Sequence, residues 1–262
     1  MSKDNPVIRR FRKLCESKRQ RRTERMFVAE GLRLVREALA EQVCRTLLVT
    51  QTAQERFGAE LSAAISGRMV IYHISDDLGK YLSETEHTQG VFAVCEQPFT
   101  ELVPEKLRAD GRYLVLHELQ DPGNVGMILR TADAFGIDAV ISCKSCEIYS
   151  PKVVRATMGA VFRLPVFEMQ DTAELGAVLH QAGLRSYAAM LDGRAVKLTA
   201  CSLGRGSAVW IGNEGSGLSP EAAAACDQSV MIPMPGNAES LNAAMAAGIF
   251  LWEMAKAGEN GT

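Results

Sequence analysis

Short apolar runs alternate with helix-length amphipathic segments along the chain, and the alternation falls into two blocks. In the first block, apolar runs at 27–28, 47–49, 69–74 and 91–95 are separated by predicted helices at 31–40, 53–65 and 76–82. Strands and helices that alternate over so short a stretch predict a small α/β sandwich.

The second block repeats the alternation on a larger scale. Strands are predicted at 113–116, 139–142, 185–189, 208–211 and 230–232, the first helix is predicted at 125–135, and a long helix rich in Ala and Met is predicted at 241–257. This order predicts an α/β domain with a mostly parallel sheet that helices cover on both faces.

Turn residues and weak periodicity set residues 97–111 apart as a linker between the two blocks. We therefore expect four parts along the chain. They are a basic N-terminal arm at 1–19, a small domain at 20–96, the linker at 97–111 and a larger α/β domain at 112–262.

Charge is distributed unevenly, although the net charge of the 262 residues is only −2. Residues 1–25 carry ten basic and three acidic side chains, a net +7, so the other 237 residues carry −9. A basic segment on a mildly acidic body suits a polyanion such as RNA, because cations that meet phosphates release counterions. A solvated, partly disordered tail would have the same composition.

Composition excludes some classes of protein. The chain is 47% hydrophobic and 23% charged, as in soluble globular proteins, and no apolar run is long enough to span a bilayer. The first residues lack the apolar core of a secretory signal, so we expect a cytoplasmic protein with reduced cysteines. Cys143 and Cys146 form a single C-x-x-C without a second pair, so no metal site is expected.

Three loops carry polar residues that could do chemistry, and the first is the loop at 121–130. It follows a predicted strand and enters a helix, which Asn124 is expected to cap. Arg130 lies less than two turns further on, where it could reach back toward the loop and hold a phosphate. An N-cap and a surface arginine would explain the same residues.

The second loop, at 210–220, has three glycines within six residues, and they let the backbone approach a ligand closely. Glu214 stands at its tip, where packing does not explain a carboxylate. The glycine spacing fits neither a P-loop nor a dinucleotide-binding loop. A simple strand-to-helix turn remains an alternative.

The third loop, at 232–242, begins with prolines that fix an extended entry. Glu239 or Ser240 is expected to begin the last helix, with Asn242 in its first turn, and mere capping is the alternative. All three loops follow predicted strands and lead into helices. Loops of this kind meet at one edge of a parallel sheet, which is where such sheets bind ligands.

These loops resemble the three motifs of the SpoU-type (TrmH-like) ribose 2′-O-methyltransferases of the SPOUT superfamily. Asn124–Arg130 fits Asn-x-Gly-x-x-x-Arg, Gly212–Gly217 fits Gly-x-Glu-x-x-Gly, and Ile232–Met234 with Ser240–Asn242 fits Ile-Pro-Met…Ser-Leu-Asn. The likeness covers residues ~112–257, including the stretch at 150–160. More weakly, residues 20–96 resemble the ribosomal-protein-like RNA-binding domain often fused to these enzymes.

The resemblance implies a parallel-sheet SPOUT domain with a C-terminal trefoil knot, preceded by a small α/β RNA-binding domain. It also implies a homodimer whose active site lies near the interface. General topology rules would have argued against a knot. The implied cofactor is S-adenosylmethionine, held by backbone groups around Gly212, Ile232 and Leu241, with Leu191 as a wall.

The resemblance further makes Arg130 the base that takes the ribose proton, although arginine keeps its proton in proteins. A milder role is to neutralise a phosphate and stabilise the emerging alkoxide. Asn124 would orient Arg130 or the ribose, and Glu214 would pair with Arg130, if need be from the partner subunit. Ser240 and Asn242 would shape the site.

The 2′-hydroxyl distinguishes RNA from DNA, so the expected substrate is RNA, with 23S ribosomal RNA first and transfer RNA second. Two other functions stay open from the sequence. One is a non-catalytic RNA-binding protein with the same fold. The other is a dinucleotide-dependent oxidoreductase, for which the chain lacks the G-x-G-x-x-G near its first strand.

Overall fold

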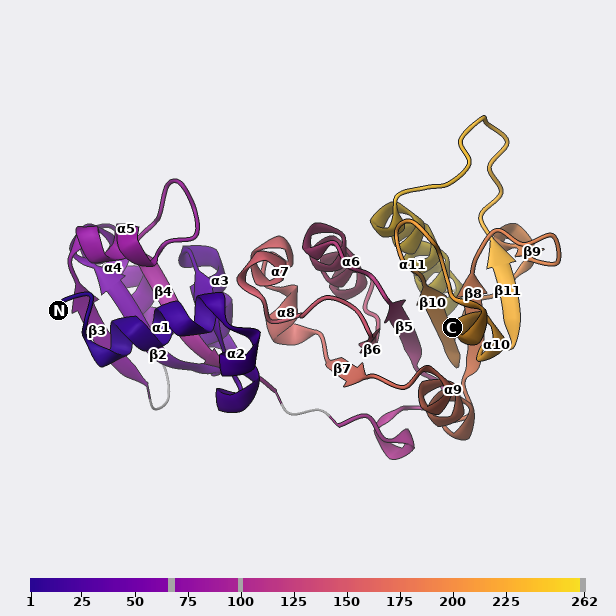
Figure 1. Cartoon of the computed structure of the whole chain (residues 1–262), viewed down its shortest axis with the longest axis horizontal. Coiled ribbons are helices and arrows are strands. Elements are labelled where there is room, and N and C mark those ends of the chain that lie inside the picture. Colours follow the sequence, from indigo (N-terminus) through magenta and orange to yellow (C-terminus); the bar gives the residue numbers. More distant parts are fainter. Residues whose placement is uncertain (66–68, 99–100, 260–262) are drawn as a thin grey trace. The chain divides into compact units, whose positions relative to one another are not determined.

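The computed structural model describes residues 1–65, 69–98 and 101–259, and within them the chain forms two compact units (Figure 1). The first unit combines the described residues up to 98 with Glu147–Arg163. The second combines the described residues of 101–146 and 164–259. The chain therefore leaves the second unit after Cys146 and returns at Leu164, which differs from the expectation of one continuous domain at 112–262.

The first unit contains a four-stranded sheet of mixed direction. Its strands, in the order β1-β4-β2-β3, are β1 (Met26–Glu30), β4 (Val91–Glu96), β2 (Cys44–Thr50) and β3 (Val70–Ile74). The first two pairings are antiparallel and the β2–β3 pairing is parallel. The helices of this unit are α1 (Pro6–Glu16), α2 (Lys18–Glu24), α3 (Leu32–Ala40), α4 (Gln51–Ala64), α5 (Asp76–Leu82), α7 (Pro151–Ala156) and α8 (Ala160–Arg163).

The N-terminal residues are folded into the first unit, and the prediction of a separate arm at 1–19 is wrong. The Asn5 side chain caps α1 by accepting from the Val7 N–H at 2.9 Å. Ile8, Phe11 and Leu14 recur at helical spacing and are buried in one hydrophobic cluster with residues of β2, β4 and α5. Burial of this apolar stripe holds α1 against the sheet.

The inserted segment Glu147–Arg163 packs on the first unit through aromatic and ionic contacts. The Phe27 ring of β1 lies 4.9 Å from the Tyr149 ring and 5.6 Å from the Phe162 ring, centroid to centroid. The buried Arg21 guanidinium donates to both carboxylate oxygens of Glu147, at 2.8 and 2.6 Å. Such a paired, desolvated contact is costly to break from one side.

The second unit is built on a seven-stranded sheet in which every pairing is parallel. Its order is β7 (Val166–Met169), β6 (Ala139–Cys143), β5 (Arg112–His117), β10 (Ser207–Ile211), β8 (Arg185–Ala189), β11 (Gln228–Met231) and β9 (Val196–Lys197). All residues of β6 and β10 are buried, which is the pattern of strands covered on both faces.

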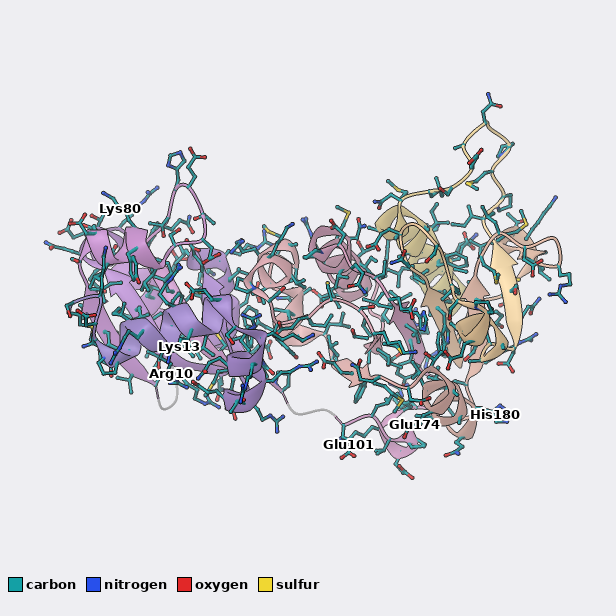
Figure 2. All side chains as sticks on the ribbon, in the orientation of Figure 1. Arg10, Lys13, Lys80, Glu101, Glu174 and His180 are labelled. Atoms are coloured by element: carbon teal, nitrogen blue, oxygen red, sulfur yellow. The ribbon has the colours of Figure 1, made fainter. Side chains whose placement is uncertain are left out.

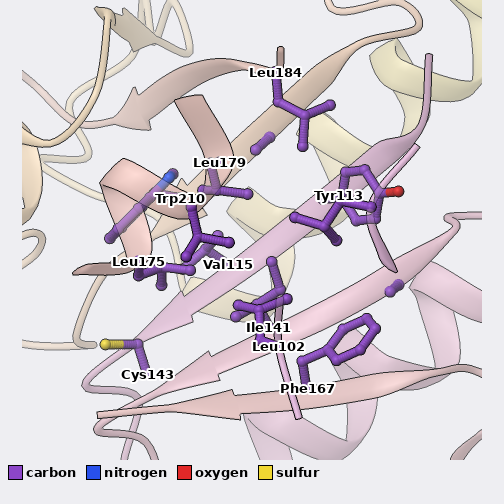
Figure 3. Packing of buried hydrophobic residues seen from close by; sticks show 14 of the residues in the cluster. Leu102, Tyr113, Val115, Ile141, Cys143, Phe167, Leu175, Leu179, Leu184 and Trp210 are labelled. Carbon is purple, nitrogen blue, oxygen red and sulfur yellow. The ribbon is translucent and has the colours of Figure 1, made fainter. Parts of the chain in front are cut away.

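Helices lie on both faces of this sheet. They are α6 (Pro122–Ala134), α9 (Thr172–Gln181), α10 (Pro220–Ala224) and α11 (Ala243–Glu259), with 3₁₀ turns η1 (Pro104–Lys106) and η2 (Leu198–Ala200). Tyr113, Val115 and Trp210 pack with α9 and α10 in one cluster (Figure 3). On the opposite face α6 packs against α11.

The predicted linker at 97–111 is only in part a linker, and residues 99–100 lie outside the described residues. Leu102 and Leu107 are buried in the same cluster as Tyr113, so this stretch already belongs to the core of the second unit.

In the described part of the chain, no helix combines the length and the apolar character that crossing a bilayer requires.

Candidate functional site

A pocket of about 340 Å³ opens where the loops that follow β8, β10 and β11 meet at the C-terminal ends of these strands. Its wall includes six of the residues predicted from the sequence, namely Leu191, Gly212, Glu214, Ile232, Ser240 and Leu241. Asn124, Asn242 and Arg130 are not part of the pocket wall. The volume lies within the range of small-molecule sites.

The loop after β10 is closed by its own backbone. The Asn213 N–H donates to the Gly217 carbonyl at 3.0 Å, and the Gly217 N–H donates to the Asn213 carbonyl at 2.9 Å. The Asn213 side chain accepts from the Gly215 and Ser216 N–H groups and donates to the Glu118 carbonyl at 2.8 Å. Asn213 therefore fixes this loop against the end of β5.

Gly212 allows this closure. A β-carbon at position 212 would lie 2.3 Å from the Gly217 carbonyl carbon and 2.3 Å from the Leu218 nitrogen. Real β-carbons do not approach backbone atoms so closely, so only glycine fits here. Glycine was expected here to let the backbone approach a ligand, and in the structure it lets the loop close on itself.

Glu214 ties the second loop to the first. Its carboxylate accepts from the Gln120 N–H at 3.2 Å, the Asp121 N–H at 3.0 Å and the Asn124 Nδ2 at 3.2 Å. Partial burial by itself raises the pKa of Glu214, but hydrogen bonds from these N–H groups outweigh it and lower the pKa. Glu214 is thus held as an anion at neutral pH.

Asn124 and Asn242 extend this connection to the third loop. Asn124 Oδ1 accepts from Asn242 Nδ2 at 3.0 Å, while Asn124 Nδ2 donates to Glu214. Asn242 Oδ1 accepts from the Ala244 and Met245 N–H groups. One chain of hydrogen bonds, Glu214–Asn124–Asn242, therefore joins all three predicted motifs.

The helix caps differ from those predicted. Asp121, not Asn124, caps α6 by accepting from the Asn124 N–H at 2.8 Å, with Pro122 as the first helical residue. α11 begins at Ala243, so Asn242 precedes the helix and caps it, and neither Glu239 nor Ser240 begins it. Capping by Asp121 leaves the Asn124 side chain available to bridge the loops.

Arg130 lies on α6, away from the pocket wall. It is exposed, and no residue of the described chain forms a hydrogen bond or ion pair with it. The expected pairing of Arg130 with Glu214 does not occur within this chain, because the Glu214 carboxylate binds the 120–124 loop instead. Met127, one helical turn before Arg130, is 56% exposed and shares its outer side of α6.

Sequence reasoning missed two residues that organise the site. Gln120 donates its side-chain amide to the Glu118 and Lys144 carbonyls and its backbone N–H to Glu214. Asn213 closes the second loop. The Asn-Glu-Gly sequence of that loop was a usable signal, because asparagine side chains commonly hydrogen-bond backbone N–H groups two residues on.

The pocket wall indicates which ligands fit. Leu191, Ile232 and Leu241 offer aliphatic surfaces for a flat base, and the second loop offers backbone groups at short range. Among the described wall residues the single charged side chain is Glu214, and there is no Lys, Arg or His. This suits a ligand that carries positive charge and disfavours a phosphate-bearing dinucleotide.

Comparisons with known proteins agree along the whole chain. A family model described as "SpoU rRNA Methylase family" matches residues 111–252, and one described as "MRM3-like substrate binding domain" matches residues 5–93. A Bacillus subtilis relative, 23S rRNA (guanosine(2553)-2'-O)-methyltransferase RlmP, is 30% identical over 266 residues, which cover 97% of each chain.

Solved structures give the same result. An AdoMet-bound rRNA methyltransferase from Sinorhizobium meliloti aligns with a TM-score of 0.83 and 31% identity over 98% of this chain and 96% of that one. The SpoU methyltransferase AviRb from Streptomyces viridochromogenes aligns with a TM-score of 0.85 and 28% identity over 98% and 99%. Because the first family match spans more than half of the 262 residues, the chain belongs to the SpoU rRNA methylase family.

Proposed function

We propose that this protein transfers a methyl group from S-adenosylmethionine to a ribose 2′-hydroxyl of 23S ribosomal RNA. The observation that carries the proposal is the pocket at the ends of the parallel strands, which the loops after β8, β10 and β11 line and in which Glu214 is the single charged side chain among the described wall residues. The rRNA assignment is supported by the Bacillus relative, whose name specifies 23S rRNA and which matches this chain almost end to end. Transfer RNA is the alternative substrate.

S-adenosylmethionine fits the pocket wall. Leu191, Ile232 and Leu241 would hold its adenine, and backbone groups near Gly212 would approach its ribose. The Glu214 anion would favour a cationic ligand, since no cationic side chain is present in the described wall. When bound, the cofactor supplies a methyl group already activated on a positively charged sulfur.

The protein's own task is to position a hydroxyl and to balance the charge that develops on it. We propose that Arg130 neutralises an RNA phosphate and stabilises the emerging alkoxide. A permanently charged guanidinium is suited to that role and poorly suited to accept a proton. Asn124 and Asn242, already joined at 3.0 Å, would set the position of the first loop, and Ser240 would shape the pocket mouth.

In a homodimer, Arg130 of one copy would reach the pocket of the other copy. Arg130 shares the outer side of α6 with Met127, and the neighbouring helix α11 exposes Met245 (61%) and Trp252 (55%). Large exposed apolar side chains on two packed helices are typical of an interface. We propose that a second copy covers this face, so that Arg130 of each copy serves the pocket of the other.

Two further features of the family resemblance belong to the proposal. One is a trefoil knot in the C-terminal part, which the strand order favours because β11 lies between β8 and β9 and α11 then returns to pack on α6 and β10. The other is a cytoplasmic location, where ribosomal RNA is modified.

The test of the function is a map of 2′-O-methyl sites in total RNA from cells with and without the gene. We expect one 23S rRNA position to lose its methyl group, and the purified protein to restore it with S-adenosylmethionine. Thermal unfolding should show stabilisation by S-adenosylmethionine and none by NAD. An unchanged map, or stabilisation by NAD alone, would refute the proposal, and loss of a tRNA site would move it to the alternative substrate.

A further inference from the structure

The N-terminal helix α1 has two opposite faces. Ile8, Phe11, Leu14 and Cys15 are buried in the first unit, so the orientation of the helix is fixed. The solvent side must then carry the remaining positions, and most of them are basic. Figure 2 marks Arg10 and Lys13 on this helix.

Some of the basic side chains near the N-terminus have structural partners. Arg21 is buried and donates to Glu147 and to the Leu14 and Cys15 carbonyls. The others with such partners are Arg10, paired with Glu24, Arg12, paired with Glu16 and Glu84, and Lys3, placed over the Tyr81 ring. These contacts hold α1 and α2 in place and also neutralise the nearby carboxylates.

Four other cations are exposed and form no ion pair with any described residue, namely Arg9, Lys13, Lys18 and Arg19. Arg9 and Lys13 are one helical turn apart, ~6 Å along α1. Lys18 and Arg19 are the first two residues of α2. Cations in the first turn of a helix interact unfavourably with the helix dipole, so Lys18 and Arg19 do not stabilise α2 in this way.

Hydrogen bonds fix the junction between α1 and α2, the two helices that carry these four cations. Ser17 ends α1 and caps α2 by accepting from the Gln20 N–H at 3.2 Å. Arg21 binds the last carbonyls of α1 at 2.6 and 2.8 Å. The charges are therefore displayed on a preorganised surface, which lowers the entropic cost of binding.

We infer that this basic face, defined by Arg9, Lys13, Lys18 and Arg19, binds the phosphate backbone of the substrate RNA. The inference rests on the proposed function and assigns the surface by which the first unit holds its substrate. Unpaired cations on a fixed surface complement a polyanion and gain free energy from counterion release. An anionic membrane is the weaker candidate, because the apolar face of α1 is already buried and cannot insert.

The test compares two double variants of the full-length protein that remove equal charge. Arg9→Gln/Lys13→Gln removes two unpaired cations. The matched control Arg45→Gln/Arg205→Gln removes two exposed cations whose charge Glu96 and Asp110 already neutralise, at 2.5 and 2.9 Å. Binding of a fluorescent fragment of 23S rRNA is measured from low to moderate salt, without S-adenosylmethionine.

We expect the first variant to bind RNA about tenfold more weakly and to lower the salt slope of log K by about 2, one unit for each lost phosphate contact. The control should match wild type, and both should keep the wild-type affinity for S-adenosylmethionine. Equal losses in both variants, or none in the first, would overturn the inference. So would binding to phosphatidylglycerol vesicles that exceeds RNA binding.

The two proposals fail separately. If the wild-type protein binds the RNA fragment but methylates no RNA, the proposed function is wrong while the binding series still decides the role of the basic face. A second variant, Lys18→Gln/Arg19→Gln, extends the test to α2, with circular dichroism as the check that α1 and α2 remain folded. A wild-type salt slope in this variant would remove α2 from the surface.

Discussion

The loop at 212–218 shows how strongly one residue can constrain a binding site. Backbone atoms of Gly217 and Leu218 occupy the space where any side chain at position 212 would begin. Gly215 lies in the same loop, but a β-carbon there would meet only the Asn213 Oδ1 at 3.7 Å, which is ordinary contact. Alanine substitutions at these two glycines therefore make a matched test and control.

Gly212→Ala should reopen the loop and weaken S-adenosylmethionine binding by about fivefold to a hundredfold, because overpacking costs ~1–3 kcal/mol. Gly215→Ala should bind nearly as wild type. Calorimetric titration of both variants measures the difference. Equal affinities for the two variants would show that closure of the 212–218 loop does not shape the pocket.

The Glu214 anion predicts an acid-sensitive site. Because its pKa is lower in the folded protein, its stabilising contribution is complete above the ordinary value of 4.5 and is lost as pH falls through the lower folded value. Glu214→Gln lacks this contribution, on the order of 1 kcal/mol for an exposed carboxylate. Thermal unfolding from pH 8 to pH 4 should show a gap between the two proteins that narrows below pH 4.5. A constant gap would assign the loss to shape rather than charge.

Substitution of Arg130 should lower the methylation rate without changing the stability of the fold. Arg130→Ala should lower the methylation rate by a factor on the order of 10²–10³, the effect of removing one group that stabilises a developing anion. Arg130 is exposed and has no hydrogen-bond or ion-pair partner among the described residues, so its removal should leave stability and S-adenosylmethionine affinity unchanged. Single-turnover methylation and calorimetry measure these quantities. Near-normal turnover would exclude both proposed roles of this arginine.

At the scale of helices and strands, the apolar pattern predicted the central elements well. β8 and α5 have the predicted bounds, and β5, β6 and β10 extend the predicted strands by one or two residues. β6 and β10 are fully buried runs, and β5 and β8 nearly so, which makes their sequences easy to recognise, while α5 buries Leu78 and Leu82 on one side at helical spacing. α1 and α2 were missed because their charge was taken as evidence for an arm, although the apolar positions of α1 recur at helical spacing.

Other elements depend on partners distant in sequence. β9 has two residues, Val196 and Lys197, and exists through its pairing with β11. No periodic pattern can reveal a strand of that length. The meeting of the three loops was predicted because each follows a strand and leads into a helix. The Glu214–Asn124–Asn242 chain was not predictable, because it joins residues 90 and 118 positions apart and depends on the conformations of their loops.

At the junction of α1 and α2, substitution of the buried Arg21 should lower the free energy of unfolding strongly. Arg21→Ala would leave the Glu147 carboxylate buried without its partner, which costs about 3–5 kcal/mol. Arg45→Ala, which breaks the exposed pair with Glu96, should cost less than about 1 kcal/mol. Urea unfolding of the two variants measures both. Similar small losses would show that Glu147 finds another donor.

At the scale of the whole molecule, the proposed dimer predicts that two impaired proteins restore activity to each other when S-adenosylmethionine is kept well below its Kd for Gly212→Ala. Arg130→Ala keeps its pocket and Gly212→Ala keeps its arginine, so a mixed dimer holds one complete site. An equal mixture after subunit exchange should recover about a quarter of wild-type activity. If each subunit serves its own pocket, the mixture stays as impaired as the two variants measured separately.

A second test of the proposed dimer uses the exposed apolar face formed by Met127, Met245 and Trp252. Trp252→Asp should place a charge on that face and yield monomers by light scattering, with loss of activity but not of S-adenosylmethionine binding. A stable dimer of this variant would place the interface elsewhere.

The insertion of Glu147–Arg163 into the first unit has a consequence for how this protein can be divided or recombined. A fragment ending near residue 98 would lack Tyr149 and Phe162, which pack on the Phe27 ring, and would expose that ring to water. It would also lack Glu147, so the Arg21 guanidinium would lose its carboxylate partner. A chimera that exchanges the RNA-holding half between two such enzymes must therefore carry both pieces together, and a cut at the obvious junction yields an incomplete fold.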